Sequence, residues 1–206
     1  MNEKDRFIVA TGNKKKFREI KKILGRLPVR VHCLKDFERR PRIVEDGATF
    51  FANARKKAVV TSLFYDALAV GEDSGLEVRA LGGRPGILSA RFSGKGATDL
   101  KNIEKLLKEL KGLPASKRGA RFVCCAVLAY KGKVVKKFEG TIQGRILESP
   151  KGSSGFGYDP VFYVPRLRKT LAQVPSKVKN RLSHRYKAIS SLSRYLRKCL
   201  KKHGAV

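Results

Sequence analysis

Residues 67–76 have the sequence Ala67-Leu68-Ala69-Val70-Gly71-Glu72-Asp73-Ser74-Gly75-Leu76, an apolar run followed at once by two neighbouring carboxylates. The apolar run predicts a buried strand that ends just before the carboxylates. Acidic residues are scarce here, 17 against 47 Lys and Arg. A pair of them at a strand terminus can supply oxygen ligands to Mg²⁺. An ordinary turn is the alternative, because Asp, Ser and Gly all favour turns.

The chain opens with a strand, a short loop and a helix. Residues 6–10 predict a buried strand, and apolar residues from Phe17 to Leu24 recur at helical spacing up to Gly25. The loop from Thr11 to Lys16 lies at the start of that helix, where free backbone N–H groups and the helix dipole favour an anion. Its three lysines oppose the dipole, which suggests that a bound anion offsets them.

Further along the chain, residues 29–33 predict a short strand and residues 49–65 a helix on which Asn53 and Lys57 share a face. Residues 97–111 predict an amphipathic helix with Thr98 as its cap. The apolar stripe of that helix consists of Leu100, Ile103, Leu106, Leu107 and Leu110.

Residues 120–130 and the run to Phe138 predict a hairpin, residues 141–147 a further strand, and residues 186–200 a helix. An opening βα unit followed by such meander strands predicts an α/β or α+β protein built on a mixed sheet. No linker divides the chain, so we expect one domain over residues 1–206.

Composition limits the class of protein. The chain has 206 residues, a mass of 23.0 kDa and a formal net charge of +30, so it attracts polyanions of any kind. Its four cysteines lack the spacing of a zinc or redox site, which predicts reduced, buried thiols. No apolar stretch reaches the ~20 residues of a membrane span. The polar start, residues 1–6, leaves no room for a signal peptide. We therefore expect a cytoplasmic protein with no membrane partner.

Two more segments are unusual. In residues 151–160, glycines flank Phe156 and Tyr158, which in an extended backbone would point the same way and offer a platform to a flat base. A glycine-rich hairpin with core aromatics is the alternative. In residues 180–185, Ser183-His184-Arg185 offer several hydrogen-bond donors at the start of a helix, with ordinary N-cap chemistry at Ser183 as the alternative.

Taken together and in this order, these segments resemble the inosine/xanthosine triphosphate pyrophosphatase family. The resemblance extends from residue 8 to residue 188. The motifs that carry it are Ala10-Thr11-Gly12-Asn13 with Lys16, residues 45–57, Glu72-Asp73-Ser74-Gly75-Leu76, Leu81-Gly82-Gly83-Arg84-Pro85-Gly86 with Ser89-Ala90-Arg91, Gly155-Phe156-Gly157-Tyr158-Asp159-Pro160, and Ser183-His184-Arg185.

The resemblance implies a two-lobed α/β fold, with a mixed β-sheet flanked by helices and a nucleotide cleft between the lobes. It also implies a homodimer and a Mg²⁺ requirement. The implied reaction is hydrolysis of purine nucleoside triphosphates other than ATP and GTP, namely ITP, dITP and XTP, to the monophosphate and pyrophosphate.

The resemblance also assigns roles residue by residue. Asp73 and Lys57 match the catalytic positions, and Glu45, Asp73 and Glu72 the metal site. The substrate-binding positions are matched by Thr11, Asn13, Lys16, Ser74, Phe156, Tyr158, Asp159, Lys179, Ser183, His184 and Arg185. Two departures stand out: the family's Glu-Asn-Ala is Ala52-Asn53-Ala54 here, and its Glu-Glu-Thr-Gly turn is Val44-Glu45-Asp46-Gly47. Asp46 is a candidate replacement for the carboxylate that is missing at position 52.

A basic nucleic-acid-binding protein with a secondary nucleotide site is the alternative from another class, because the net charge of +30 exceeds what a mononucleotide needs. The chain has no recognisable RNA- or DNA-binding module, however, and it keeps the full catalytic set. A surface adapted to a salty or hot environment also fits the charge.

Overall fold

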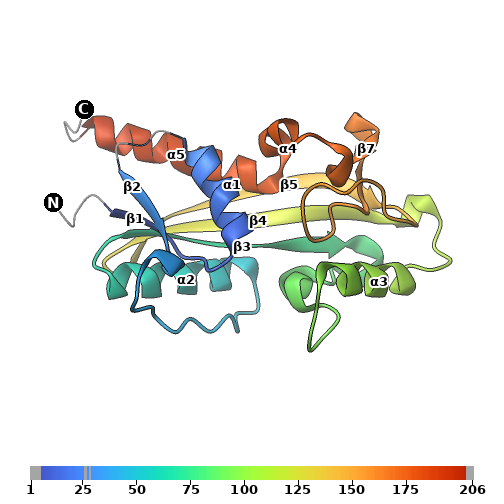
Figure 1. Cartoon of the computed structure of the whole chain (residues 1–206), viewed down its shortest axis with the longest axis horizontal. Coiled ribbons are helices and arrows are strands. Elements are labelled where there is room, and N and C mark those ends of the chain that lie inside the picture. The colour runs from blue at the N-terminus through green and yellow to red at the C-terminus, as the bar shows by residue number, and fades with distance from the viewer. Residues whose placement is uncertain (1–5, 26, 28, 203–206) are drawn as a thin grey trace. The chain divides into compact units, whose positions relative to one another are not determined.

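The structure is a computed structural model that describes residues 6–25, 27 and 29–202, so the polar start at residues 1–5 lies outside the described part. The chain forms two compact units. Unit 1 contains residues 1–73, 124–140 and 185–206, and unit 2 contains residues 74–123 and 141–184. Figure 1 shows helices on both faces of a sheet, which confirms the α/β prediction.

The strands form one mixed sheet with the order β2-β1-β3-β4-β5-β6-β7. Strand β1 is parallel to β2 and β3, whereas β6 is antiparallel to β5 and β7. The strands are β1 (Arg6–Val9), β2 (Arg30–Cys33), β3 (Leu68–Val78), β4 (Gly119–Tyr130), β5 (Lys133–Ile146), β6 (Phe162–Val164) and β7 (Lys169–Thr170).

Unit 1 has three layers. Helices α1 (Lys14–Leu24) and α5 (His184–Lys202) cover one face of its sheet, and α2 (Phe50–Phe64) covers the other (Figure 1). Because side chains alternate along a strand, Val9 and Val70 pack with α1 and α5, whereas Ile8 and Ala69 belong to a separate cluster. This alternation decides which helix each polar residue of β3 meets.

Helix α2 lies very close to β3. A Cβ atom at Gly71 would stand 2.1 Å from the carbonyl oxygen of Ala54 and 2.5 Å from the backbone nitrogen of Ala58, so only glycine fits there. The close approach brings Asn53 and Lys57, both buried, against the strand as their shared face predicts.

Unit 2 packs α3 (Asp99–Glu109) against a core that includes Leu76, Phe122 and Phe162. Thr98 caps α3 as predicted, since its hydroxyl accepts the N–H of Lys101 at 3.2 Å. The predicted stripe was wrong at Leu100, which is 62% exposed in the first turn of the helix. Unit 2 also contains α4 (Ser176–Leu182), a helix that was not among the predicted elements.

Three predicted boundaries were wrong. Strand β3 does not end before the carboxylates but continues to Val78. The two strands expected on either side of Gly140 are a single strand, β5. Helix α1 begins at Lys14, so the lysines expected in a loop form its first turn. None of the helices in the described residues is long and apolar enough to cross a membrane.

Candidate active site

The loop between β1 and α1 is built around Asn13. Its side-chain oxygen accepts the N–H groups of Lys15 at 2.9 Å and Lys16 at 3.1 Å, and its own N–H donates to the Thr11 hydroxyl at 3.1 Å. The first turn of α1 therefore has three lysines and no acidic residue. A cationic turn at the positive end of a helix dipole is suited to an anion such as phosphate.

Glu72 and Asp73 lie beside the end of β1, where Ala10 donates its N–H to the Val70 carbonyl at 2.8 Å. Both residues are buried in the middle of β3, so their side chains point to opposite faces of the sheet. Glu72 contacts residues of α1 and α5, and Asp73 contacts residues of α2. The argument that a strand terminus presents both carboxylates to one metal ion was therefore wrong, because β3 continues past them, whereas the metal roles that the resemblance implies for Glu72 and Asp73 stay predictions.

The first group of side chains, which we call the α2 cluster, consists of Glu45, Asn53, Lys57 and Asp73. The ammonium nitrogen of Lys57 lies 2.8 Å from Glu45 Oε2 and 3.6 Å from Asp73 Oδ1. Asn53 donates to Asp73 Oδ2 at 3.1 Å and accepts the N–H of Gly47 at 2.8 Å. Asn53 thus ties the segment that carries Glu45 to the strand that carries Asp73.

The environment of Asp73 perturbs its acidity. Burial raises the pKa of the Asp73 carboxyl above its ordinary value, and the ammonium groups of Lys57 and Lys16 offset this only in part. A carboxylate with a raised pKa is a stronger base than an exposed one and is a candidate to accept a proton from water.

The α2 cluster fits a magnesium ion by its chemistry. Glu45 and Asp73 converge on the same ammonium group, so the two carboxylates face a common cation. Mg²⁺ usually takes one or two protein carboxylates and completes its shell with water and substrate phosphates. In the described residues, no group of three or more His, Cys, Asp or Glu side chains is placed to hold a metal. Asp46 forms an exposed ion pair with Lys56.

The second group, the α1 cluster, consists of Lys16, Glu19, Glu72, Cys124 and Arg185. Glu72 Oε2 lies 3.1 Å from the Lys16 ammonium, and Glu72 Oε1 accepts from Arg185 Nε at 3.2 Å and from Cys124 Sγ at 3.4 Å. Arg185 also pairs with Glu19 at 2.6 Å.

Charge compensation in the α1 cluster takes place within the protein. Burial alone would lower the pKa of Arg185, but the carboxylates of Glu72 and Glu19 outweigh it, so the pKa is raised. Burial and the nearby Glu72 raise the pKa of the Cys124 thiol, which keeps it protonated. Arg185, predicted to bind substrate, is therefore engaged by two carboxylates, and Glu72 by two cations.

The third group, the Asp159 cluster, lies in unit 2 and consists of Phe156, Asp159 and Lys179. The Lys179 ammonium lies 2.6 Å from Asp159 Oδ2 and 4.9 Å from the centre of the Phe156 ring. The same carboxylate oxygen accepts the Phe156 N–H at 2.9 Å. A Cβ atom at Gly155, whose φ is +88°, would stand 2.2 Å from this oxygen, so the turn requires glycine. An ammonium with three donors beside an aromatic ring is suited to an oxygen-bearing flat base.

The remaining predicted residues have other surroundings. The expected extended platform is absent from residues 155–160, which form turns, and Tyr158 lies in the core with its hydroxyl donating to the Ser89 carbonyl at 2.9 Å. His184 stacks on Phe122 with ring centroids 4.8 Å apart. Ser183 ends α4 and precedes α5, and its N–H donates to the Lys179 carbonyl at 2.9 Å. Ser74 follows Asp73 on β3 and is half-buried.

Two polar residues of these groups, Glu19 and Cys124, were not predicted from the sequence. Glu19 stands one turn after Lys16 on α1, so helical spacing alone could have paired the two on one face. Cys124 is an apolar-looking residue in a strand, and only the folded sheet brings it to Glu72.

Comparison with known proteins assigns the chain to a protein family. The model of the Ham1 family matches residues 7–195, and the chain belongs to that family. It is 46% identical over 191 residues to the dITP/XTP pyrophosphatase of Geobacter sulfurreducens, covering 93% of this chain and 96% of the relative. The dITP/XTP pyrophosphatase of Halalkalibacterium halodurans is also 46% identical, over 190 residues that cover 92% of this chain and 98% of the relative.

Solved structures agree with the fold. The HAM1 protein of Coxiella burnetii superposes with a TM-score of 0.86 at 35% identity, covering 94% of this chain and 98% of its own. The Ham1 protein of Staphylococcus aureus gives a TM-score of 0.85 at 38% identity, with the same coverage.

Proposed function

We propose that this chain hydrolyses ITP, dITP and XTP to the nucleoside monophosphate and pyrophosphate. The observation that carries the proposal is the α2 cluster, in which a buried lysine holds two carboxylates that approach one point from different segments of unit 1. The names of the relatives, dITP/XTP pyrophosphatase, support the choice of substrates.

The phosphate tail is bound by cations of unit 1. A nucleoside triphosphate carries close to four negative charges, and Lys16, Lys57 and the start of α1 supply compensating charge. Glu45 and Asp73 would hold Mg²⁺, which when bound neutralises charge on the phosphate oxygens. Asn53 fixes one oxygen of Asp73 by donating to it at 3.1 Å.

The reacting water is activated by Asp73. Its raised pKa suits it to take the proton as water attacks the α-phosphorus, where the bond to the leaving pyrophosphate breaks. Lys57 stabilises the charge that develops on the phosphate oxygens.

The base is selected by hydrogen-bond donors. Inosine and xanthosine present an oxygen at position 6, where adenosine presents an amino group. Lys179 has three N–H donors, and its ammonium lies 2.6 Å from Asp159 and beside the Phe156 ring. A donor aimed at position 6 is satisfied by the oxygen but meets another donor in adenine, which a polar pocket rejects strongly. Guanine shares the 6-oxygen, so its rejection must depend on its 2-amino group.

The test is pyrophosphate release with Mg²⁺ over a panel of ITP, dITP, XTP, ATP, GTP, CTP and UTP, repeated with EDTA. We expect the first three to be hydrolysed far faster than the others, with monophosphate as the second product. Release of orthophosphate, equal rates for ATP and ITP, or full activity in EDTA would each refute part of the proposal. Light scattering after size exclusion tests the homodimer that we also propose.

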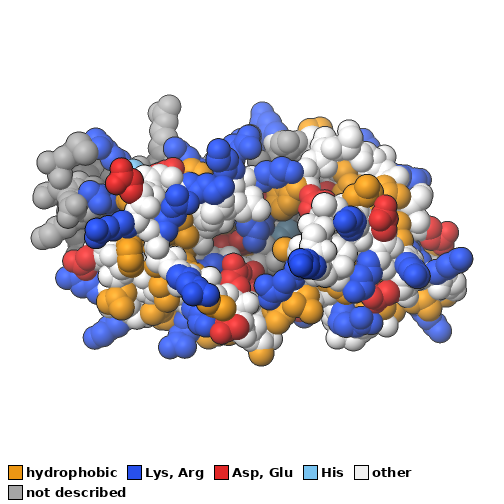
Figure 2. All heavy atoms as spheres, turned by 60° about the horizontal axis from the view of Figure 1, so that its bottom comes forward, with side chains coloured by type: hydrophobic (Ala, Val, Ile, Leu, Met, Phe, Trp, Pro, Cys, Tyr) orange, Lys and Arg blue, Asp and Glu red, His pale blue; other side chains and the backbone are white. Residues whose placement is uncertain are grey.

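Nucleic-acid binding remains the second candidate because of the charge. Figure 2 shows Lys and Arg side chains spread over the face in view and not gathered into one patch, which fits non-specific attraction of polyanions better than a docking surface. Binding of RNA or duplex DNA with a steep salt dependence and without sequence preference is the expected result of a gel-shift titration.

A further inference from the structure

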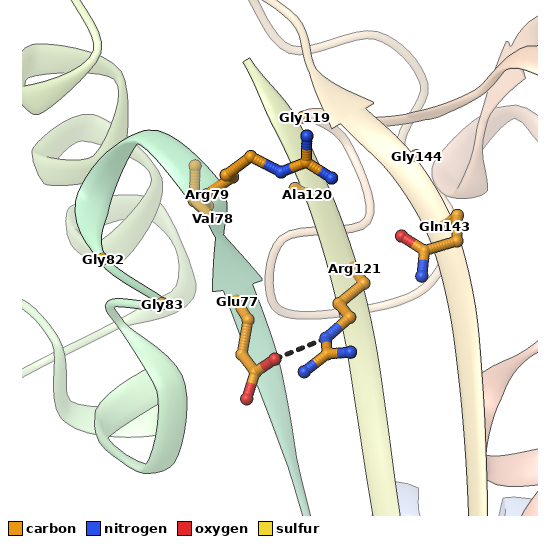
Figure 3. A pocket seen from close by; sticks show the side chains of 10 residues that line it. All are labelled: Glu77, Val78, Arg79, Gly82, Gly83, Gly119, Ala120, Arg121, Gln143 and Gly144. Atoms are coloured by element: carbon orange, nitrogen blue, oxygen red, sulfur yellow. Dashed lines mark hydrogen bonds and ion pairs between the residues drawn. The ribbon is translucent and has the colours of Figure 1, made fainter. Parts of the chain in front are cut away.

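A hollow of about 550 Å³ lies on unit 2, at the C-terminal end of β3 and the N-terminal end of β4, and beside β5 (Figure 3). None of the residues that line it belongs to the α1, α2 or Asp159 clusters. Its volume is within the ~300–1,000 Å³ that small-molecule sites occupy.

The floor of the hollow is the face of the sheet opposite the core. Val78, Ala120 and Ile142 pack into the core of unit 2, so the residues that alternate with them, Glu77, Arg121 and Gln143, project from the other face. Small-molecule sites are in general lined mainly by hydrophobic side chains with a few placed polar groups. This lining is charged, amide-bearing and glycine-rich, and it selects a polar ligand.

Arg79 and Arg121, the two arginines of the hollow, have guanidinium nitrogens that can bind an oxyanion. Glu77 accepts from Arg121 Nε at 2.6 Å, which orients the guanidinium and leaves its two terminal nitrogens for another acceptor. Arg79 is exposed and extends over the same strands (Figure 3), and among the described residues it has no ion-pair partner. Paired guanidinium nitrogens match the spacing of phosphate oxygens.

We propose that this hollow binds a phosphate-bearing small molecule of nucleotide size, at a site additional to the one that hydrolyses the triphosphate. Arg79 and Arg121 hold the phosphate, and Gln143 donates or accepts a hydrogen bond at the rest of the ligand. With Glu77 the charged residues of the hollow sum to one positive charge, which a phosphate monoester more than neutralises. Gly119 leaves the space open, because a Cβ atom there would meet nothing within 4 Å.

The probe is adenosine monophosphate, a phosphate monoester whose 6-amino group does not suit the base selection proposed above. Binding is measured by titration calorimetry and by chemical-shift changes mapped onto the chain. Two variants test the site by different means: Arg79→Glu/Arg121→Glu reverses its charge, and Gly119→Phe fills the hollow without changing charge. Arg166→Glu/Arg168→Glu is the matched control, because both arginines are exposed in unit 2 and lie outside the hollow.

We expect both test variants to weaken binding by about tenfold or more and the control by less than about twofold, because only the former remove bidentate contacts or the space itself. Thermal melts check that each variant folds. Inorganic phosphate should compete at a higher concentration than the monoester.

Two results would overturn the proposal at once: no binding of adenosine monophosphate to the wild type, or equal weakening of binding in the control variant. Unchanged binding in test variants whose oligomeric state shifts would also overturn it, because the hollow would then be a contact with a second copy of the chain. Because the titration needs no turnover, its outcome is independent of the pyrophosphatase assay.

Discussion

Asp73 is the residue on which the proposed chemistry depends. Asp73→Asn keeps the shape and the hydrogen bond from Asn53 but removes the base, so kcat should fall by about 10²-fold or more. The value of kcat is measured by pyrophosphate release from ITP. Asp46→Asn is the matched control, because Asp46 pairs with Lys56 at an exposed position and its loss should change kcat by less than about twofold. Near-normal turnover in Asp73→Asn would remove this residue from the mechanism.

Glu72, which directly precedes Asp73, is expected to contribute to stability and not to the metal site. Glu72→Gln removes one of the two carboxylates that pair with buried Arg185, so the free energy of unfolding should fall by about 3 kcal/mol. The Mg²⁺ concentration for half-maximal activity should rise in Glu45→Gln and stay unchanged in Glu72→Gln. Urea denaturation and a Mg²⁺ titration measure the two effects.

Glu139→Gln is the control for stability, because its pair with Lys137 is exposed and contributes less than about 1 kcal/mol. A shift of the Mg²⁺ requirement in Glu72→Gln as large as that in Glu45→Gln would restore Glu72 as a metal ligand.

At the scale of elements, the backbones of α2 and β3 approach each other closely at Gly71. Gly71→Ala places a methyl group into the backbone of α2 and should destabilise the protein by about 1–3 kcal/mol, with a loss of activity because Asn53 and Lys57 move with the helix. Gly119→Ala is the control, since a Cβ atom there meets nothing, and it should be neutral or slightly stabilising. Equal Tm values for the two variants would mean that α2 can move away from β3 without loss of stability.

The end of β2 supplies a pH-dependent contact. The Cys33 N–H donates to Asp36 Oδ2 at 2.8 Å, and this bond lowers the pKa of the Asp36 carboxyl. A lowered folded-state pKa means that the ionised carboxylate stabilises the fold above its unfolded pKa of ~3.9 and that this stability is lost as the pH falls through the folded-state value.

Asp36→Ala should therefore reduce the free energy of unfolding by about 1 kcal/mol at neutral pH, and the difference from the wild type should disappear in acid. Denaturation at a series of pH values checks this. Glu148→Ala, a change at an exposed residue, is the control. A difference that persists in acid would assign the effect to packing.

The elements also show what sequence patterns could predict. Apolar periodicity located α3 and α5, because each buries apolar residues at helical spacing, whereas the buried face of α2 includes the polar residues Asn53 and Lys57. The predicted strand boundaries were the main error: the polar residues Glu72 to Gly75 and the break before Thr141 both lie inside strands, and Gly71 is needed there because the backbone of α2 occupies the space of a Cβ atom. Motif resemblance identified Glu72 and Asp73, but their separation onto opposite faces followed only from the uninterrupted strand. Phe156 and Tyr158 diverge because positive φ angles at Gly155 and Gly157 turn the chain.

At the scale of the whole molecule, the net charge of +30 predicts self-repulsion. Raising NaCl from about 0.1 M to about 1 M shortens the Debye length from ~10 Å to ~3 Å, so the Tm should rise. Differential scanning calorimetry measures the change, with sucrose as a non-ionic comparison. A Tm that falls with NaCl would mean that attractive ion pairs outweigh the repulsion.

The alternation of β3 has a consequence for how this sequence changes over evolutionary time. Glu72 and Asp73 are adjacent in the sequence, but Glu72 pairs with a residue of α5 and Asp73 with a residue of α2. Among relatives, a replacement of Arg185 should therefore be accompanied by a change at Glu72 or Glu19 while Asp73 stays the same, and a change at Lys57 should be correlated with Asp73 and Glu45. Two neighbouring codons would then covary with distant partners and not with each other.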